Sequence, residues 1–398
     1  MSRRGATGLA GVLAIDKPAG MTSHDVVNRV RRITGERRVG HAGTLDPLAT
    51  GLLLVGVGPA TRLSSYLTAR DKTYVARIVF GLSTDTDDAD GRVMEVPSAH
   101  VLAERLELVG RLDAREVCGR LVGETEQLPP AYSAIKKGGV TAYAAARAGE
   151  ALELETRTVT VHTCEFLGAS TVTERLAVAA GEGMQGDVPG GGASVGDVHA
   201  GLSRNGDVFE GYVHEENAYD EGAYDETAQA RAAGEESASA GSAGDGASVC
   251  GPAYAEMQLA CWDVRLVVSK GTYVRSIARD LGAAIGCGAH VGALRREAVG
   301  GFDVSRAVTL DELAAAAKAG GELPWCDPVE LLGFPVVELT PQMERDVACG
   351  RRLSGEVAGG EGSRVSCVSG RRLMAVYEQA AGGLRPATVI GGGVAGVA

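Results

Sequence analysis

The chain has 398 residues, a hydrophobic fraction of 45% and a formal net charge of −12 at pH 7. This length predicts two domains or one large domain with appendages, and the apolar content excludes a wholly disordered chain. No apolar run approaches the roughly 20 residues that span a bilayer, and the N-terminus lacks the pattern of a signal peptide. Eight scattered cysteines without a CxxC pair predict reduced thiols in the cytoplasm, and neither disulfides nor a metal site.

The acidity is concentrated in one segment. Residues 168–256 contain sixteen acidic and three basic residues, whereas residues 1–77 contain twelve basic and five acidic residues. A basic N-terminal part is compatible with binding to nucleic acid, although the whole chain is acidic. The acidic segment is also rich in Gly, Ala and Ser and cannot bury enough apolar surface to fold. We therefore predict a flexible insertion between the strand-like flanks TVTVHTCEFL and MQLACWDVRLVV.

Ahead of the insertion, short strands are predicted at residues 11–15, 52–57 and 73–80. Thr22 or Ser23 can cap a helix whose valines follow helical spacing. The polar segment DTDDADG (residues 85–91) is similar to a calcium loop, but Pro97 stands where such a loop requires glutamate. A turn between strands is the better interpretation.

After the insertion, Tyr273, Ile277 and Leu281 stand four residues apart on a predicted helix. Thr309 and Glu312 predict a capping box for a second, alanine-rich helix. From about residue 335 the tail contains a short helix and several strand-like segments, which indicates a small, mostly β module. This irregular mixture of strands and helices favours an α+β fold.

The segment GHAGTLDPLATG (residues 40–51) has three glycines and a proline, which specify a loop. It contains His41 and Asp46 and follows Arg37 and Arg38. A carboxylate beside a basic approach path suits covalent chemistry on a nucleic acid. On spacing alone, the better interpretation of Asp46 is a cap for the turn before Pro47.

This loop belongs to a series of segments that resembles the bacterial tRNA pseudouridine-55 synthase family (TruB type). The other segments are GVLAIDKPAGMTSHDVV, DKTYVARIVFGLSTDTDDADG, QLPPAYSAIKKGGVTAYAAARAGE, SKGTYVRSIARDLG and CGAHVGALRR. They stand in the family's order and cover about 290 of the 398 residues.

The resemblance implies an α+β pseudouridine-synthase fold with a mixed, mainly antiparallel sheet and flanking helices. The catalytic domain would span residues 1–325, interrupted by the insertion at 168–256, and residues 335–398 would form a PUA-like RNA-binding module. The implied reaction converts uridine 55 of the tRNA T-loop to pseudouridine after base flipping. It needs no cofactor or metal, and the implied partner is the tRNA T-arm. The protein would act as a cytoplasmic monomer without an obligatory protein partner.

By the same resemblance, Asp46 is the nucleophile, Tyr74 stacks on the target base and Arg275 pairs with Asp46. The implied substrate-binding residues are His41, Lys17, Pro18, Tyr273, Leu294 and Lys136. An arginine suits its role because it favours the ionised carboxylate and binds both oxygens, which lysine cannot do. By contrast, Arg279 is expected to be solvated.

Several alternatives stay open at this stage. Tyr74 could be an ordinary core aromatic, and Gly138 and Gly139 could form a surface turn rather than a hinge. Whether Asp46 attacks C1′ of the sugar or C6 of the uracil is undecided. Two rival functions are a guide-RNA-dependent synthase, which shares the GTLD loop, and a tRNA-folding chaperone.

Overall fold

The computed structural model describes residues 7–95, 97–150, 152–178, 253–355 and 358–397. Most of the predicted insertion, residues 179–252, therefore lies outside the described residues. The elements that form the site belong to one compact unit made of residues 1–174 and 258–398.

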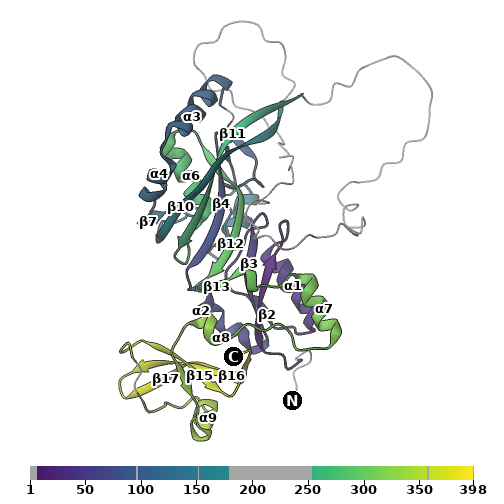
Figure 1. The fold of residues 1–398 in the computed structure, drawn as a ribbon, viewed down its shortest axis with the longest axis vertical. Coiled ribbons are helices and arrows are strands. Elements are labelled where there is room, and N and C mark those ends of the chain that lie inside the picture. Colours follow the sequence, from purple (N-terminus) through teal and green to yellow (C-terminus); the bar gives the residue numbers. More distant parts are fainter. Residues whose placement is uncertain (1–6, 96, 151, 179–252, 356–357, 398) are drawn as a thin grey trace, which may run out of the picture. The chain divides into compact units, whose positions relative to one another are not determined.

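A large mixed sheet forms the centre of this unit, with the strand order β1-β3-β12-β4-β11-β10-β7 (Figure 1). Neighbouring strands pair antiparallel at β1–β3, β4–β12, β4–β11 and β7–β10, whereas β3 and β12 run parallel. The predicted α+β fold with a mixed, mainly antiparallel sheet is thereby confirmed. The strands are β1 (Gly11–Lys17), β2 (Val39–His41), β3 (Thr50–Val57), β4 (Lys72–Phe80), β7 (Gly123–Gln127), β10 (Arg157–Val178), β11 (Ala253–Val268), β12 (Ala289–Val299) and β13 (Phe302–Asp303).

Helices pack against this sheet, and two short hairpins form separate two-stranded sheets. Helix α6 packs on β12 and β4, while α1 packs on β2 and α7. The helices are α1 (Ser23–Thr34), α2 (Ser64–Thr68), α3 (Ala99–Arg111), α4 (Ala114–Arg120), α5 (Ala142–Arg147), α6 (Val274–Ile285), α7 (Leu310–Ala319) and α8 (Pro328–Leu332), with 3-10 turns at η1 (Gly58–Leu63) and η3 (Val304–Arg306). The hairpins are β5 (Ser83–Thr84) with β6 (Val93–Glu95), and β8 (Lys136–Lys137) with β9 (Val140–Thr141).

Local sequence signals explain where the helices begin. Thr22 caps α1 and forms a reciprocal capping box with Asp25, because each side chain satisfies a backbone N–H that the first helical turn leaves free. Thr309 and Glu312 form the predicted capping box at α7. Helix α1 ends at Gly35, which adopts φ 67°, a left-handed conformation that glycine adopts without a steric penalty.

The two strands that flank the insertion are longer than the sequence flanks predicted. Strand β10 continues to Val178 and β11 begins at Ala253. The physical reason is that the segment TVTERLAV (residues 171–178) keeps β-branched and apolar residues in alternation. The Gln258 side chain also donates to Thr173 across the two strands at 2.7 Å. Their adjacency fits the prediction that the insertion replaces a short hairpin connection.

The tail forms a separate four-stranded sheet with the order β14-β15-β16-β17, and it also contains helix α9. These elements are β14 (Val336–Glu338), α9 (Pro341–Ala348), β15 (Arg364–Ser369), β16 (Arg372–Ala380) and β17 (Gly383–Ala395). A core cluster joins this sheet to the main one, because Leu373 and Val376 pack in the same cluster as Leu52 and Leu54 of β3. The predicted mostly β tail is confirmed.

Candidate active site

Asp46 lies in the Asp46 loop (residues 42–49), which connects β2 to β3. The loop is tied to β3 at its start and to the turn after β1 near its end. The Ala42 N–H donates to the Leu54 carbonyl at 2.8 Å, and the Gly20 N–H donates to the Pro47 carbonyl at 2.9 Å. Immediately after the loop, Gly51 has φ 97° and lies so close to β12 that a Cβ atom there would stand 2.3 Å from the Arg296 carbonyl oxygen. Glycine is therefore required where the loop joins the sheet.

Arg275, on the first turn of α6, contacts both carboxylate oxygens of Asp46. Its Nη2 donates to Oδ1 at 3.1 Å, and its Nε lies 2.9 Å from Oδ2 as a close charge contact. The Arg275 side chain is 4% exposed and the Asp46 side chain 31% exposed. The carboxylate is thus oriented by a buried cation on one side and remains accessible on the other.

The other contacts of Arg275 fix its guanidinium in place. Its Nη1 donates to the Thr86 carbonyl at 2.8 Å, and its Nη2 donates to the Tyr132 carbonyl at 3.0 Å. Nη1 also lies 3.6 Å from Oδ2 of Asp88, whose side chain is 6% exposed. Arg275 therefore stands between two carboxylates and joins the Asp46 loop to two other segments of the chain.

Asp88 is an unexpected member of the site. Burial raises its pKa to about 6, although a hydrogen bond from Thr86 and the charge of Arg275 act in the opposite direction. The Thr86 hydroxyl donates to Asp88 Oδ1 at 2.5 Å. The preceding residue, Asp87, has φ 60° and pairs with Arg279 at 3.2 Å. The prediction of a turn between strands is confirmed, but Arg279 is paired there rather than solvated, so that expectation was wrong.

Besides Arg275, three buried cations lie beside the Asp46 loop: Lys17, Lys72 and Arg296. The Nζ of Lys17 donates to the Pro18, Met21 and Pro47 carbonyls at 2.9, 2.6 and 3.3 Å. Burial, with the Asp46 charge acting in the opposite direction, lowers the pKa of Lys17 to about 8.

Arg296 on β12 is 1% exposed and donates to the Leu52 carbonyl at 2.7 Å and the Gly43 carbonyl at 3.2 Å. Lys72 beside it caps the end of α2 by donating to the Thr68 carbonyl at 2.5 Å, and burial lowers its pKa to about 8. Within the described ranges, none of Lys17, Lys72 and Arg296 forms an ion pair at salt-bridge distance. The cations hold backbone carbonyls and also make the potential around the loop positive.

His41 and Tyr74 are placed by neighbouring strands. His41 ends β2 opposite Val55 of β3, and its Nδ1 is buried without a hydrogen-bond partner. Burial and the nearby Arg296 charge lower the pKa of His41, which favours the neutral form of its ring. Tyr74 on β4 pairs with Arg296 of β12. Two residues away on each strand, Ala76 of β4 pairs with Leu294 of β12. Tyr74 and Leu294 thus share one face of adjacent strands and one core cluster.

The remaining predicted site residues lie around this centre. Pro18 is exposed in the turn after β1. Tyr273 precedes α6, where Gln127 bonds both its N–H and its carbonyl, and its ring lies 5.5 Å from the Arg157 guanidinium carbon. Lys136 is exposed on β8. The structure therefore brings Asp46 and Arg275 into direct contact, and Lys17 binds the carbonyl of the next residue, Pro47. Among the described residues, neither Lys136 nor Tyr273 forms a hydrogen bond or an ion pair with Asp46.

Sequence reasoning missed Asp88 and Arg296. Asp88 stands in a run of aspartates that predicts a polar turn between strands, and nothing in that pattern singles out one of them as buried. Arg296 follows Leu294 and Arg295 in a strand-like segment. Its alternation with Leu294 could have indicated a buried arginine, because every second residue of a strand faces the same side.

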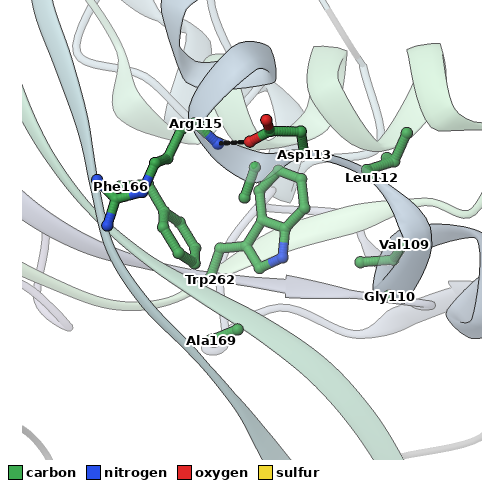
Figure 2. A pocket seen from close by; sticks show the side chains of 9 residues that line it. Val109, Gly110, Leu112, Asp113, Arg115, Phe166, Ala169 and Trp262 are labelled. Atoms are coloured by element: carbon green, nitrogen blue, oxygen red, sulfur yellow. Dashed lines mark hydrogen bonds between the residues drawn. The ribbon is translucent and has the colours of Figure 1, made fainter.

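A surface hollow elsewhere in the molecule has a different character. Its volume is about 240 Å³, and it lies beside α3, α4, β10 and β11 (Figure 2). It is lined by Val109, Leu112, Arg115, Phe166, Ala169 and Trp262, among others. Arg115 stacks 5.9 Å from the Phe166 ring centroid. None of the predicted site residues lines this hollow.

Two features are absent from the described residues. In that part of the chain, no group of three or more His, Cys, Asp or Glu side chains could hold a metal ion. Over the same residues, no helix combines the length and apolar character needed to cross a bilayer.

Two family models match segments of the chain that contain the predicted site residues. The family model "TruB family pseudouridylate synthase (N terminal domain)" matches residues 31–185, which include Asp46 and Tyr74. The model "tRNA pseudouridylate synthase B C-terminal domain" matches residues 275–323, which include Arg275 and Leu294.

Similar full-length proteins are bacterial. The chain is 37% identical to tRNA pseudouridine synthase B of Thermobifida fusca over 382 residues, covering 96% of this chain and 99% of the relative. It is 35% identical to the protein of that name from Mycobacterium tuberculosis (strain H37Rv) over 391 residues, covering 96% of this chain and 98% of the relative.

Among solved structures, the crystal structure of the archaeal box H/ACA sRNP Nop10–Cbf5 complex matches with a TM-score of 0.51 and 19% identity, covering 96% of this chain and 86% of that chain. A Cbf5–Nop10–Gar1 complex matches with a TM-score of 0.52 and 20% identity, covering 96% of this chain and 84% of that chain. At this identity the similarity shows a shared fold.

Proposed function

The chain belongs to the TruB family of bacterial tRNA pseudouridine synthases, and we propose that it isomerises uridine 55 in the tRNA T-loop with Asp46 as the nucleophile. Enzymes of this family are isomerases that form pseudouridine in tRNA. The observation that carries the proposal is the buried Arg275, which grips both oxygens of an accessible Asp46 carboxylate.

The reaction requires a nucleophile from the protein and precise placement of the target uridine beside it. The bond between C1′ and N1 of uracil breaks, the base rotates, and a bond between C1′ and C5 forms. C5 then loses its proton and N1 gains one, so no redox change or group transfer occurs and no cofactor is required. Asp46 forms a transient bond to either C1′ or C6 and is released at the end. The two-pronged Arg275 contact supports this role because it holds the carboxylate in one orientation beside a buried positive charge.

The target base must first leave the folded T-loop, which costs a few kcal/mol. We assign the flipped base to the space above Asp46, with Tyr74 stacking on it and Leu294 closing the uracil pocket. The neutral ring of His41 would take the place of displaced bases in the T-loop. Lys17 and Pro18 would support the wall of the pocket, and Tyr273 would shape its α6 side.

Contacts to the RNA backbone would supply the energy for flipping. The exposed Lys136 hairpin (residues 136–141) and the exposed Arg37 and Arg38 before β2 are the groups we assign to phosphates. The tail module, residues 335–398, is proposed to be a PUA-like RNA-binding unit of the same enzyme. We further propose that the protein acts as a cytoplasmic monomer, and the free thiols of the described cysteines are compatible with a reducing compartment.

The competing proposal is a guide-RNA-dependent synthase. Identity of 35–37% to bacterial tRNA pseudouridine synthase B over nearly the whole chain, against 19–20% to the Cbf5 structures, favours the stand-alone enzyme. The test is to incubate the purified protein with a bare T-arm stem-loop and to map pseudouridine by sequencing. We expect one modified uridine at position 55. Modification that requires a guide RNA, or that falls at another site, would refute the proposal.

A further inference from the structure

Leu45, the residue immediately before Asp46, is held by a side chain from another element. The Ser23 hydroxyl accepts a hydrogen bond from the Leu45 N–H at 2.8 Å and donates one to the Leu45 carbonyl at 2.9 Å. Ser23 is 3% exposed and Leu45 is 3% exposed. One hydroxyl therefore satisfies both the N–H and the carbonyl of a buried residue that lies 22 positions further along the chain.

Helix α1 does not require this hydroxyl. Ser23 is the first helical residue, and the cap of α1 is provided by Thr22, whose side chain accepts from the Asp25 N–H while Asp25 bonds back to Thr22. The capping function that the sequence offered to either residue is thus carried by Thr22. The Ser23 side chain is left to bind the Asp46 loop.

The residue after Asp46 is fixed independently. The Pro47 carbonyl accepts from the Gly20 N–H at 2.9 Å and from Lys17 Nζ at 3.3 Å. Asp46 therefore stands between two anchored residues, and Ser23 supplies the anchor on its N-terminal side. Arg275 fixes the carboxylate group, whereas these anchors fix the backbone from which it projects.

We propose that Ser23 is a positioning residue for catalysis, which holds the Leu45 peptide so that the Asp46 carboxylate meets both Arg275 and the target nucleotide. This inference rests on the proposed function. Without the hydroxyl, the buried Leu45 peptide has to move toward other partners, since buried backbone groups are nearly always paired. A displacement of about 1 Å in a reacting group can cost roughly 100-fold in rate.

The test compares Ser23→Ala with a matched variant on the same helix. Thr34, at the other end of α1, also uses one buried hydroxyl to donate to a carbonyl, that of Val30 at 2.8 Å, and to accept from an N–H, that of Glu36 at 3.3 Å. Thr34→Val removes these bonds far from the Asp46 loop. Ser23→Cys keeps a weak donor and acceptor in place and serves if Ser23→Ala does not fold. For each protein we would measure the single-turnover rate at saturating T-arm RNA, the Kd of the RNA and the melting temperature.

We expect Ser23→Ala to lower the single-turnover rate by about 10- to 100-fold, with the Kd changed less than about twofold because Ser23 is buried away from the RNA. Ser23→Cys should be intermediate. Thr34→Val should lower the melting temperature by a similar amount and keep the wild-type rate. A Ser23→Ala rate within twofold of wild type, or an equal rate loss in Thr34→Val, would overturn the inference. If the wild type forms no pseudouridine at all, the proposed function fails instead.

Discussion

Arg275 contacts Asp46 through two nitrogens and bonds to the Thr86 and Tyr132 carbonyls with its remaining donors. Two backbone carbonyls therefore hold the guanidinium in place in addition to the carboxylate. A lysine at this position could reach one oxygen but not span both, and would leave carbonyls of buried segments unpaired.

Arg275→Lys is accordingly expected to lower kcat by about 100-fold or more, equivalent to about 2.7 kcal/mol of transition-state stabilisation. The KM for tRNA should change only a few-fold, because Arg275 is buried and does not reach the protein surface that binds RNA. Steady-state kinetics on T-arm RNA would measure both. Arg279→Lys, one turn further along α6, is the control and should stay within a few-fold of wild type. Equal losses in the two variants would show that the helix, and not the Asp46 contact, is at fault.

Asp88 gives the site a pH dependence. Burial raises its pKa from the ordinary 3.8 to about 6, so Asp88 loses its charge as the pH falls through 6 and no longer balances Arg275. We expect kcat to decline below about pH 6 in the wild type. Asp88→Asn should have a lower kcat at pH 7.5 and should lose this decline. A pH–rate profile in which both proteins fall in parallel would contradict the assignment.

The same shift in Asp88 has a consequence for stability. Since the folded protein binds this proton more tightly than the unfolded chain, the contribution of Asp88 to folding is favourable below about pH 4 and is lost as the pH rises to about 6. The wild type should therefore lose stability relative to Asp88→Asn over this pH range. Urea denaturation at pH 4 and at pH 6.5 would measure the difference.

At the scale of elements, the Asp46 loop depends on how closely β3 approaches β12. Gly51 pairs with Arg296 in the parallel register, and the space for a Cβ atom at Gly51 is occupied by the Arg296 backbone. Gly20, in the turn after β1, also has a positive φ but has nothing within 4 Å of a Cβ position. The two glycines share the same conformational requirement and differ in the space around them.

Gly51→Ala is expected to destabilise the protein by about 3 kcal/mol or more, since it adds both a strained backbone and a backbone clash. Gly20→Ala should cost about 1 kcal/mol, from the positive φ alone. Urea denaturation would compare them. If both variants lost the same stability, the close approach of β3 to β12 would not be the cause.

The Lys136 hairpin is the element we assign to the RNA backbone. Gly138 and Gly139 have φ 63° and 87° and form its two-residue turn, which is the surface turn that the sequence offered as the alternative to a hinge. Lys136→Ala should raise the Kd for T-arm RNA a few-fold and reduce the slope of log K against log salt by about 1, with kcat unchanged. Lys318→Ala on α7 is the control for charge alone. An unchanged salt slope in Lys136→Ala would exclude a phosphate contact.

The elements that the sequence predicted well are those set by local rules. The buried strands β1, β3 and β4 follow from continuous apolar runs, and the starts of α1 and α7 follow from capping boxes. Interactions between distant segments could not be predicted in this way. Arg275 meets Asp46 across 229 positions and Thr86 across 189. The first contact was expected only through family resemblance, while the pairing of Arg279 with Asp87 was not expected at all.

At the scale of the whole molecule, the proposed catalysis assigns no role to the insertion. Strands β10 and β11 lie next to each other in the sheet, and each carries ordinary strand residues up to Val178 and from Ala253. Replacing residues 179–252 with an Asn-Gly turn would join them as a hairpin. We expect the rate on T-arm RNA to stay within a few-fold of wild type. A deletion variant that folds, with a wild-type melting temperature, but has lost activity would assign the insertion a catalytic role.

The most direct test of the central claim is tritium release from a tRNA transcript labelled at C5 of uracil. Formation of the C1′–C5 bond expels this hydrogen, so release reports the isomerisation itself. We predict release by the wild type, mapped to a single T-loop uridine, and none by Asp46→Asn, which should still bind the tRNA with a similar Kd. Release by Asp46→Asn at a rate near that of the wild type would contradict the assignment of Asp46 as the nucleophile.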